Sequence, residues 1–396
     1  MNPPRVDRLL LGITGGIAAY KTAELVRLLV GQGNEVDVVM TEAARQFVTP
    51  VTLQAVSGRP VWHDAWDPRV PNNMAHIELS RDKGLVLIAP ASADFIAKLA
   101  NGLCDDLLST LCLARDCPLA VAPAMNRQMW ENPATRRNIA RLLDDGIEIW
   151  GPAAGDQACG EIGMGRMLEP AQLAERVVRS FTTKTLNGLR VLVTAGPTFE
   201  RIDAVRAITN LSSGKMGYAI ARAAWEAGAE VTLVSGPTSL DAPPVARFAQ
   251  VSSAQDMLAT VNAFVPDADI FVSVAAVADY HVLNPSDQKI KKDAHILTLE
   301  LAPNPDILAS VSALPDPPFC VGFAAESENL DEFAEAKRRR KNLPLLAANF
   351  VQTAFGADDN ELVLFDDDGR HPLPRASKLE QARMLIAHIS KLYQPR

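Results

Sequence analysis

Lysine and carboxylate side chains gather in the second half of the chain, where they could neutralise a triphosphate. The segment KIKK covers residues 289–292, and AEAKRRRKN places Lys337 and Lys341 four residues apart, on one face of a helix. Asp279 follows an apolar segment in AAVADY. A lysine run by itself is more often a solvated helix face. Two runs and a carboxylate in one acidic domain favour a phosphorylated ligand with a metal ion.

The first half carries three separate candidates for substrate binding or proton transfer. His76 lies in MAHIELS, which we expect to be a loop leading into a helix or strand. Asn126 closes the apolar run in PAMN, where it could face a ligand or cap a helix. Cys159 lies in the glycine-rich stretch 155–167, which favours a lid or a loop whose backbone contacts the ligand. Taken singly, each residue type is also common in structural roles.

The glycine motifs do not match the familiar nucleotide fingerprints. Gly12, Gly15 and Gly16 lack the GxGxxG spacing, and Thr41 follows the second apolar run where a dinucleotide site usually has an acid. A hydroxyl there better suits a mononucleotide phosphate or ribityl chain. In SSGKMG the lysine precedes Met216, so this is not a Walker A loop. Neither GxSxG nor HExxH occurs, so nucleophile-elbow hydrolases and zinc proteases have no motif support.

Alternating strands and helices must position these residues. Apolar runs at 9–14, 35–41, 85–92 and 119–125 predict strands, and helical spacing follows the first of them. VLVTAGPT, SSGKMGYAIARAAWEAG and EVTLVS repeat the pattern after the polar segment FTTKTLNGLR. We therefore predict the α/β class, with two doubly wound, mainly parallel, Rossmann-like domains. The predicted domains are 1–183 and 190–396, joined by a linker at 184–189.

The second domain carries an enlarged connection after its first strand. Leu9 and Val36 are 27 residues apart in the first domain, whereas Arg190 and Val231 are 41 residues apart in the second. The second domain therefore has about 14 more residues between its first strand and the helix that follows. In open α/β sheets, ligands bind at the carboxyl ends of the strands. On position alone, a nucleotide or phosphate site and a plain surface loop are about equally supported.

Composition limits the class of protein. The 396 residues are 48% hydrophobic and 22% charged with a net charge of −8, which excludes a disordered chain and disfavours nucleic acid as a partner. No apolar run reaches the length of a membrane span, and the N-terminus lacks a signal peptide pattern. The five cysteines show no CxxC spacing, so neither a zinc site nor a disulfide framework is indicated. We expect a cytoplasmic protein without membrane contact.

Longer motifs resemble two enzyme families. GITGGIAAYK, HIELS, PAMNRQMW and ACGEIGMGRM resemble the flavin-dependent cysteine decarboxylases, which implies a flavodoxin-like first domain. VTAGPTFERIDAVRAITNLSSGKMG, AAVADY and KIKK resemble the phosphopantothenate–cysteine ligases. Over nearly its whole length, the chain is similar to the bacterial bifunctional proteins of coenzyme A biosynthesis.

The resemblance implies two consecutive reactions. The C-terminal half would join 4′-phosphopantothenate and L-cysteine using CTP with Mg²⁺, through an acyl-cytidylate. The N-terminal half would bind FMN and decarboxylate the product to 4′-phosphopantetheine, with the flavin as the electron sink. The family also implies a homo-oligomer, a dodecamer that combines trimers of flavin domains with dimers of ligase domains.

The resemblance also implies roles for individual residues. Catalytic roles fall on His76, Asn126 and Cys159 in the first half, and on Asn210 and Lys289 in the second. The positions around FMN are Gly15, Gly16, Thr41, Ser92 and Asp94. The positions around CTP are Asp279, Lys289, Pro305, Asp306, Ile307, Leu308, Phe323, Lys337 and Lys341. The Mg²⁺ ion would be held mainly by the nucleotide phosphates, and its protein ligands are unknown.

Two departures from the family pattern and two alternative functions remain. Lys83-Gly84 stands where the family usually has Ala-Asp, and Pro344 and Phe350 lie beside the expected CTP site.

One alternative is a single-activity enzyme, such as a flavodecarboxylase with a non-functional ligase half. The other is a non-catalytic, flavin-binding regulatory subunit, against which the intact His76, Asn126 and Cys159 argue.

Overall fold

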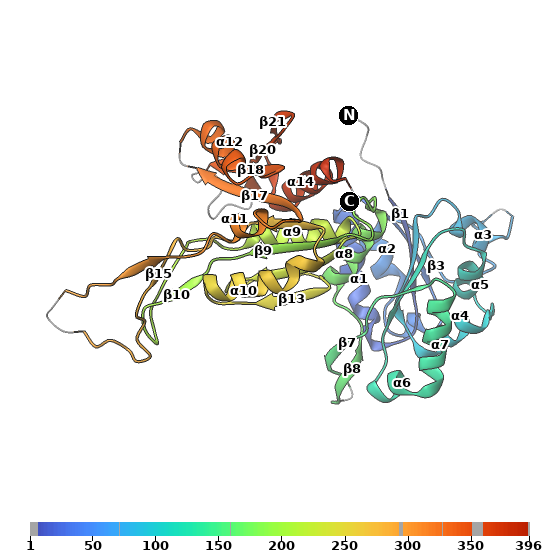
Figure 1. Cartoon of the computed structure of the whole chain (residues 1–396). Helices are drawn as coiled ribbons and strands as arrows, with labels where there is room; N and C mark the ends of the chain where they lie inside the picture. The colour runs from blue at the N-terminus through green and yellow to red at the C-terminus, as the bar shows by residue number, and fades with distance from the viewer. Residues whose placement is uncertain are drawn as a thin grey trace. The chain divides into compact units, whose positions relative to one another are not determined.

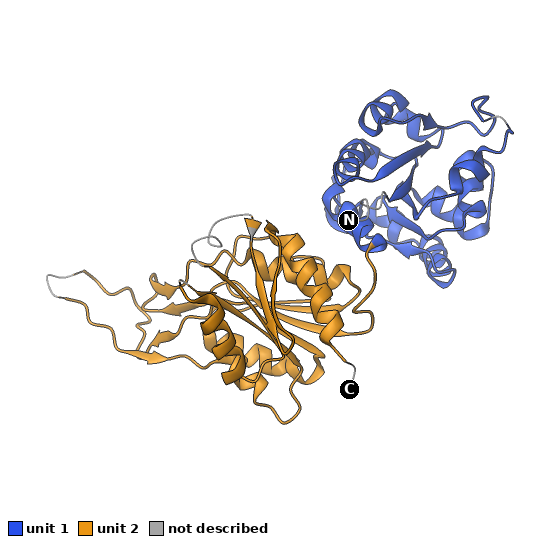
Figure 2. Cartoon of the chain, turned by 90° about the horizontal axis from the view of Figure 1, so that it is seen from above, with its two compact units in different colours: residues 1–181 blue, residues 182–396 orange. Residues whose placement is uncertain are grey.

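The computed structural model describes residues 7–70, 72–158, 160–292, 296–326, 328–350 and 359–394. The chain divides into two compact units, the first ending at Phe181 and the second beginning at Thr182 (Figure 2). Each unit is built on its own sheet, and each is described by itself.

Unit 1 contains a six-stranded parallel sheet in the order β3-β2-β1-β4-β5-β6. The order reverses between β1 and β4, which makes their carboxyl ends the switch point where α/β sheets bind ligands. The strands are β1 (Arg8–Ile13), β2 (Glu35–Met40), β3 (Val61–Trp62), β4 (Leu85–Ala91), β5 (Leu119–Pro123) and β6 (Glu148–Ile149).

Helices cover both faces of this sheet, which explains its continuous apolar runs. Leu9, Leu11 and Ile13 of β1 pack with α1, α2 and α8, whereas Leu10 faces the side of α4, α5 and α7. The helical segments are η1 (Ile17–Lys21), α1 (Thr22–Gly31), η2 (Ala44–Gln46), α2 (Pro50–Ser57), α3 (Ala75–Ser80), α4 (Ala93–Asn101), α5 (Leu107–Ala114), α6 (Arg127–Glu131), α7 (Pro133–Asp144) and α8 (Pro170–Phe181).

The departure at Lys83-Gly84 is accommodated by its neighbours in the fold. The nearly buried Lys83 ammonium pairs with the nearly buried carboxylate of Asp37 in β2, which also accepts a hydrogen bond from Arg59 at 2.6 Å. At Gly84, a Cβ would lie 2.3 Å from the Phe181 ring, so any side chain at this position would force the ring to shift.

Lys83→Met is expected to lower the free energy of unfolding of unit 1 by about 2–3 kcal/mol, because buried Asp37 would lose one of its two cationic partners. Burial alone would raise the pKa of Asp37, but the hydrogen bonds from Arg59 and Lys83 outweigh it and lower the pKa. The stabilisation is therefore present above the unfolded pKa of about 3.9 and is lost as the pH falls through the lower folded pKa. Urea denaturation at pH 7 and in acid measures both effects.

The control for that variant is Arg81→Met, since Arg81 pairs with Asp116 at 2.7 Å in an exposed position. Its cost should stay below about 0.5 kcal/mol. Equal stability of the two variants would contradict a stabilising role for the buried pair.

Unit 2 repeats the strand order in its parallel part. Its eight-stranded sheet runs β13-β12-β9-β14-β17-β18-β20-β21, parallel as far as β18 and antiparallel beyond. The strands are β9 (Arg190–Ala195), β12 (Glu230–Ser235), β13 (Arg247–Gln250), β14 (Ile270–Ser273), β17 (Phe319–Glu326), β18 (Leu345–Phe350), β20 (Val363–Asp366) and β21 (Gly369–Pro372). The prediction of two doubly wound, mainly parallel α/β domains is confirmed.

Helices again cover both faces of the sheet. Val191 and Val193 pack on the side of α9 and α14, and Leu192 packs on the side of α10, α11 and α12. The helices are α9 (Lys215–Glu226), α10 (Ala254–Phe264), η3 (Val265–Asp267), α11 (Ile307–Ser312), α12 (Leu330–Arg340) and α14 (Lys378–Leu392). A small ladder pairs β19 (Asp359–Asn360) with β22 (Ala376–Ser377). Among the described helices, none combines the length and hydropathy needed to cross a membrane.

The extra residues after β9 form part of an arm that projects from the sheet of unit 2 (Figure 1). They contain the hairpin of β10 (Phe199–Arg201) and β11 (Ala207–Thr209). A second antiparallel pair, β15 (Tyr280–Val282) and β16 (Leu301–Pro303), forms beside β10 and carries the connecting segment outward. Lys289 lies on that segment.

Candidate active sites

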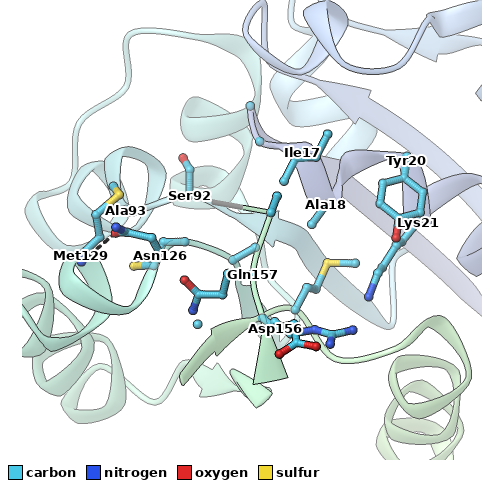
Figure 3. Close-up of a pocket in the computed structure, with 18 residues that line it drawn as sticks. Ile17, Ala18, Tyr20, Lys21, Ser92, Ala93, Asn126, Met129, Asp156 and Gln157 are labelled. Carbon is cyan, nitrogen blue, oxygen red and sulfur yellow. Dashed lines mark hydrogen bonds between the residues drawn. The ribbon is translucent and has the colours of Figure 1, made fainter. Parts of the chain in front are cut away.

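A cavity of about 500 Å³ opens in unit 1 at the carboxyl ends of β1, β4 and β5. Side chains of Ile17, Ser92, Asn126, Met129 and Gln157 surround it from separate segments (Figure 3). Its volume lies in the range typical of small-ligand sites. The full lining comprises Gly15, Gly16, Ile17, Ala18, Tyr20, Lys21, Ser92, Ala93, Ala124, Met125, Asn126, Met129, Asp156, Gln157, Ala158, Gly165, Arg166 and Met167.

Buried Thr14 joins the ends of the two central strands. Its hydroxyl donates to the carbonyl of Pro90 at 2.7 Å and accepts the N–H of Ser92 at 3.0 Å. The Ser92 side chain in turn caps α4 by accepting the N–H of Phe95 at 3.2 Å. These contacts join the end of β1 to the start of α4 at the switch point.

The two glycines of the first loop differ in their surroundings. A Cβ on Gly15 would lie 2.6 Å from the Cβ of Ala43, so the loop can approach its neighbour only as glycine. A Cβ on Gly16 would meet nothing within 4 Å, and Gly16 lines the cavity. A side chain at Gly16 would therefore take up open space beside the cavity rather than press on the protein.

The glycine-rich segment forms a hairpin of β7 (Ala153–Asp156) and β8 (Ile162–Arg166) next to the cavity. The N–H of Met125 donates to the carbonyl of Gly165 at 3.0 Å, and a Cβ on Gly165 would lie 2.3 Å from the Met125 carbonyl oxygen. Gln157 adds a contact by accepting the N–H of Arg127 at 3.0 Å. The hairpin thus meets the loop after β5 through its backbone.

Gly165→Ala is expected to weaken that contact, because the added methyl group overlaps a backbone oxygen at φ +141°. The overlap should accelerate hydrogen exchange of the Met125 amide about 10- to 100-fold. Ile162→Ala on the same hairpin is the control, since Ile162 is 71% exposed, and it should leave the exchange rate unchanged. Equal exchange rates in both variants would mean that the hairpin does not depend on this contact.

Two cationic residues that sequence reasoning missed also line the cavity. The Lys21 ammonium, almost buried, pairs with Glu169 at 2.7 Å, and Arg166 donates to the same carboxylate at 3.1 Å. The hydrogen bond from Lys21 lowers the pKa of Glu169. Lys21 ends the motif GGIAAYK, so its place five residues beyond Gly16 was the available signal.

The structure brings some of the predicted residues of unit 1 together. Gly15, Gly16, Ser92 and Asn126 line the cavity, and Asn126 also caps α6 by accepting the N–H of Met129 at 3.0 Å. Its two possible roles, at a ligand crevice and as a helix cap, are therefore compatible.

Other predicted residues of unit 1 do not line the cavity. Thr41 follows β2 and accepts the N–H of Ala44 at 3.2 Å, and Asp94 lies exposed in the first turn of α4. The expected loop position of His76 was wrong: it lies in the first turn of α3, because Ala75, Leu79 and Ser80 form a buried face there. Cys159 lies outside the described residues.

The cavity is large enough for a mononucleotide, and its lining offers both apolar and polar groups. Ile17, Ala93, Met129 and other apolar residues could cover a flat ring system, and the glycine loop after β1 offers backbone without side chains. Ser92, Asn126 and Lys21 could bind its polar edge or phosphate. These are the residues that could hold the flavin that the motifs of unit 1 imply.

In unit 2, Lys337 and Lys341 at the end of α12 contact β17 and the start of α11. The Lys341 ammonium, just beyond α12, pairs with Asp306 at 2.5 Å, and Lys337 donates to the carbonyl of Phe323 at 2.8 Å. Burial, together with the charge of Lys341, lowers the pKa of Lys337. Burial would raise the pKa of Asp306, but the hydrogen bond from Lys341 outweighs it and lowers the pKa. An anionic ligand could therefore replace Asp306 as the partner of Lys341 and the Phe323 carbonyl as the partner of Lys337.

Side-chain amides tie the remaining loops to this cluster. Asn304 donates its Nδ2 to the carbonyl of Ala278 at 2.9 Å, and its N–H donates to the carbonyl of Asp279 at 2.8 Å. Asn210 donates to the carbonyl of Ala276 at 2.9 Å. Asn210, Asp279, Pro305 and Asp306 therefore share one edge, beyond the strands of the sheet. Asn304 was missed because an amide in a turn carries no specific signal.

The other predicted CTP residues contribute in different ways. Ile307 and Leu308 are buried in the core, so their backbone alone could face a ligand. Pro344 directly precedes β18, and Phe350 at its end is 45% exposed and lies opposite Glu326. In the described part of the chain, no hydrogen bond or ion pair joins exposed Lys289 to the lysine cluster.

A separate histidine pair lies outside both sites. Asp366 accepts hydrogen bonds from His371 at 2.8 Å and His388 at 2.7 Å, and all three could in principle ligate a metal. Because both carboxylate oxygens already have partners, we interpret the cluster as a tie between β21, β20 and α14.

Comparison with known proteins places two family models on the chain. The model described as flavoprotein matches residues 3–182, and the model of the DNA/pantothenate metabolism flavoprotein C-terminal domain matches residues 186–393. The coenzyme A biosynthesis bifunctional protein CoaBC of Vibrio vulnificus is 52% identical over 391 residues, covering 97% of this chain and 98% of its own length. The protein of the same name from Escherichia coli is 49% identical over 394 residues, covering 98% and 97%.

A solved structure is similar to part of the chain. The crystal structure of the C-terminal domain of the coenzyme A biosynthesis bifunctional protein CoaBC covers 53% of this chain and 98% of its own, with 40% identity and a TM-score of 0.47.

Proposed function

The chain belongs to the family of the coenzyme A biosynthesis bifunctional proteins, and from this membership we propose how its two units divide the work. The protein is an enzyme with two activities, a flavoprotein decarboxylase in unit 1 and a ligase in unit 2. Unit 2 joins 4′-phosphopantothenate to L-cysteine with CTP and Mg²⁺, through an acyl-cytidylate. Unit 1 decarboxylates 4′-phospho-N-pantothenoylcysteine to 4′-phosphopantetheine. Both reactions take place in the cytoplasm.

The cavity at the switch point of unit 1 supports the decarboxylase assignment. Bound FMN supplies the electron sink that a carboxylate beside a thiol-bearing carbon lacks. Asn126, at the cavity wall, binds the substrate carboxylate, and the hairpin of β7 and β8 excludes water from it. Cys159 donates a proton in the last step, and His76 acts on the substrate early. Because His76 does not line the cavity of its own chain, this role needs a neighbouring subunit.

The lysine cluster supports the ligase assignment. Lys337 and Lys341 neutralise the phosphates of CTP, and the turn from Pro305 to Leu308 with Phe323 holds the nucleotide. Asn210 stabilises the acyl-cytidylate step. Lys289 places a positive charge where negative charge develops in forming the acyl-cytidylate. The observation that carries this proposal is the convergence of Asp306 at the start of α11, Phe323 in β17, and Lys337 and Lys341 at the end of α12.

A homo-oligomer is part of the proposal. Apolar side chains on the arm of unit 2 and just after its β10–β11 hairpin are exposed: Ile296 at 94% and Val205 at 64%, and Leu211 at 90%. Such a surface suits a second copy of unit 2. We propose dimers of unit 2 and trimers of unit 1, combined in a dodecamer, and sedimentation of a monomer that retains FMN would contradict this.

Product analysis tests both activities at once. The protein is incubated with 4′-phosphopantothenate, L-cysteine, Mg²⁺ and CTP, and products are followed by mass spectrometry. CMP together with 4′-phosphopantetheine is the expected result. CMP with 4′-phospho-N-pantothenoylcysteine alone would overturn the decarboxylase assignment. Absence of CMP would overturn the ligase assignment, and ATP in place of CTP tests the nucleotide preference.

A further inference from the structure

Asp203 is a buried carboxylate at the turn between β10 and β11, at the arm of unit 2. Its Oδ1 accepts the N–H groups of Val205 and Arg206, each at 2.8 Å. Its Oδ2 accepts the Arg206 guanidinium at 2.6 and 2.9 Å and also the N–H of Ile290 at 3.1 Å. Oδ1 thus accepts hydrogen bonds only from the turn itself, whereas Oδ2 also accepts one from Ile290, which lies 87 residues away in the sequence.

Ile290 is held at both of its backbone groups. While its N–H donates to Asp203, its carbonyl accepts the Arg206 Nη2 at 3.2 Å. On the other side of Lys289, Ser286 donates its N–H to the carbonyl of Ile202 at 3.0 Å and its hydroxyl to the carbonyl of Gln288 at 2.7 Å. The segment that carries Lys289 is therefore fixed to the turn on both sides of the lysine.

The contacts of Asp203 exceed what the turn alone requires. The two N–H groups and the guanidinium of Arg206 would already stabilise a buried carboxylate. These hydrogen bonds, that of the Arg206 side chain first, hold the pKa of Asp203 well below its usual range, so it is ionised at neutral pH. The additional bond to Ile290 acts on the lysine segment.

We propose that Asp203, with Arg206, is the positioning residue that holds Lys289 in place for acyl-cytidylate formation. The inference rests on the proposed function of Lys289. An exposed lysine on a long connection loses much of its benefit as a catalytic cation if its backbone moves, because small displacements from the reacting geometry cost rate steeply.

Asp203→Asn separates the two tasks of the carboxylate. The amide oxygen can still accept the N–H groups of Val205 and Arg206, which keeps the turn. The amide nitrogen then faces the N–H of Ile290 and the Arg206 guanidinium, and donors cannot pair with donors. Asp256→Asn is the matched control, because that carboxylate bonds the backbone of Ser253 within the cap of its own helix.

The experiment follows the release of pyrophosphate from CTP and 4′-phosphopantothenate by the full chain. We expect Asp203→Asn to slow this step about 100-fold, with the decarboxylase unchanged and Asp256→Asn close to the unaltered enzyme. Combining Asp203→Asn with Lys289→Gln should be no slower than Lys289→Gln alone, because both act through one group. Trypsin should cleave at Lys289, Lys291 and Lys292 faster in Asp203→Asn.

Three outcomes would overturn or redirect the inference. If Asp203→Asn keeps its rate while Lys289→Gln loses it, Asp203 does not position the lysine. If the double variant is far slower than Lys289→Gln, Asp203 acts independently. If Lys289→Gln is fully active, the proposed function of Lys289 fails instead. Should Asp203→Asn not fold, Arg206→Lys removes the two guanidinium N–H donors to Oδ2 while keeping the charge, and it must slow the same step.

Discussion

Lys289→Gln is expected to lower the rate of acyl-cytidylate formation about 100- to 1,000-fold. A cation aimed at developing charge contributes most in the transition state, and glutamine keeps the length and polarity of the side chain without the charge. Decarboxylation of synthetic 4′-phospho-N-pantothenoylcysteine by the same preparation should be unchanged, because unit 1 has its own core and cavity. Quenched-flow measurement of pyrophosphate and of the acyl-cytidylate gives the result.

Lys292→Gln is the matched control for Lys289→Gln. Lys292 is also exposed and belongs to the same KIKK segment, so its loss should alter the general attraction of anions in a similar way. Its rate should change less than about threefold, in keeping with a screened surface charge. Equal losses in both variants would replace a specific role for Lys289 with general electrostatic attraction.

Gly16→Val is expected to raise the Kd for FMN about 10- to 100-fold. A Cβ at this position would meet no protein atom within 4 Å apart from its chain neighbours, so we expect valine to compete with the cofactor for the cavity rather than to strain the fold. Thermal unfolding of the flavin-free protein should therefore be unchanged, and the ligase reaction should continue. Titration of flavin-free protein with FMN, followed by flavin fluorescence, measures the affinity.

Gly31→Val provides the corresponding control in unit 1. Gly31 ends α1, would meet no protein atom within 4 Å of an added Cβ apart from its chain neighbours, and is not among the residues that line the cavity. It should bind FMN as the unaltered protein does. Full FMN affinity in Gly16→Val would show that the cofactor lies elsewhere than beside the glycine loop.

The sequence alone determined the doubly wound architecture of both units. Continuous apolar runs such as 85–91, separated by helical spacing, require parallel strands covered on both faces, because neither element can bury its apolar surface by itself. The same patterns place glycines and polar residues after the strands, where parallel sheets bind ligands. Local periodicity carries this information because it depends on neighbours within a few residues.

The tertiary structure decided which residues meet. Lys83 pairs with Asp37, Lys341 pairs with Asp306, and Asp203 accepts a hydrogen bond from Ile290, and in each case the two residues are far apart in the sequence. Such partners are set by strand order and loop path, and the spacing of residues along the chain does not specify them. His76 is a further example: the motif HIELS could be recognised in the sequence, but not that His76 would lie in α3, outside the residues that line the cavity. Hydrogen bonds and ion pairs act over a few ångströms in space, so only the folded chain determines them.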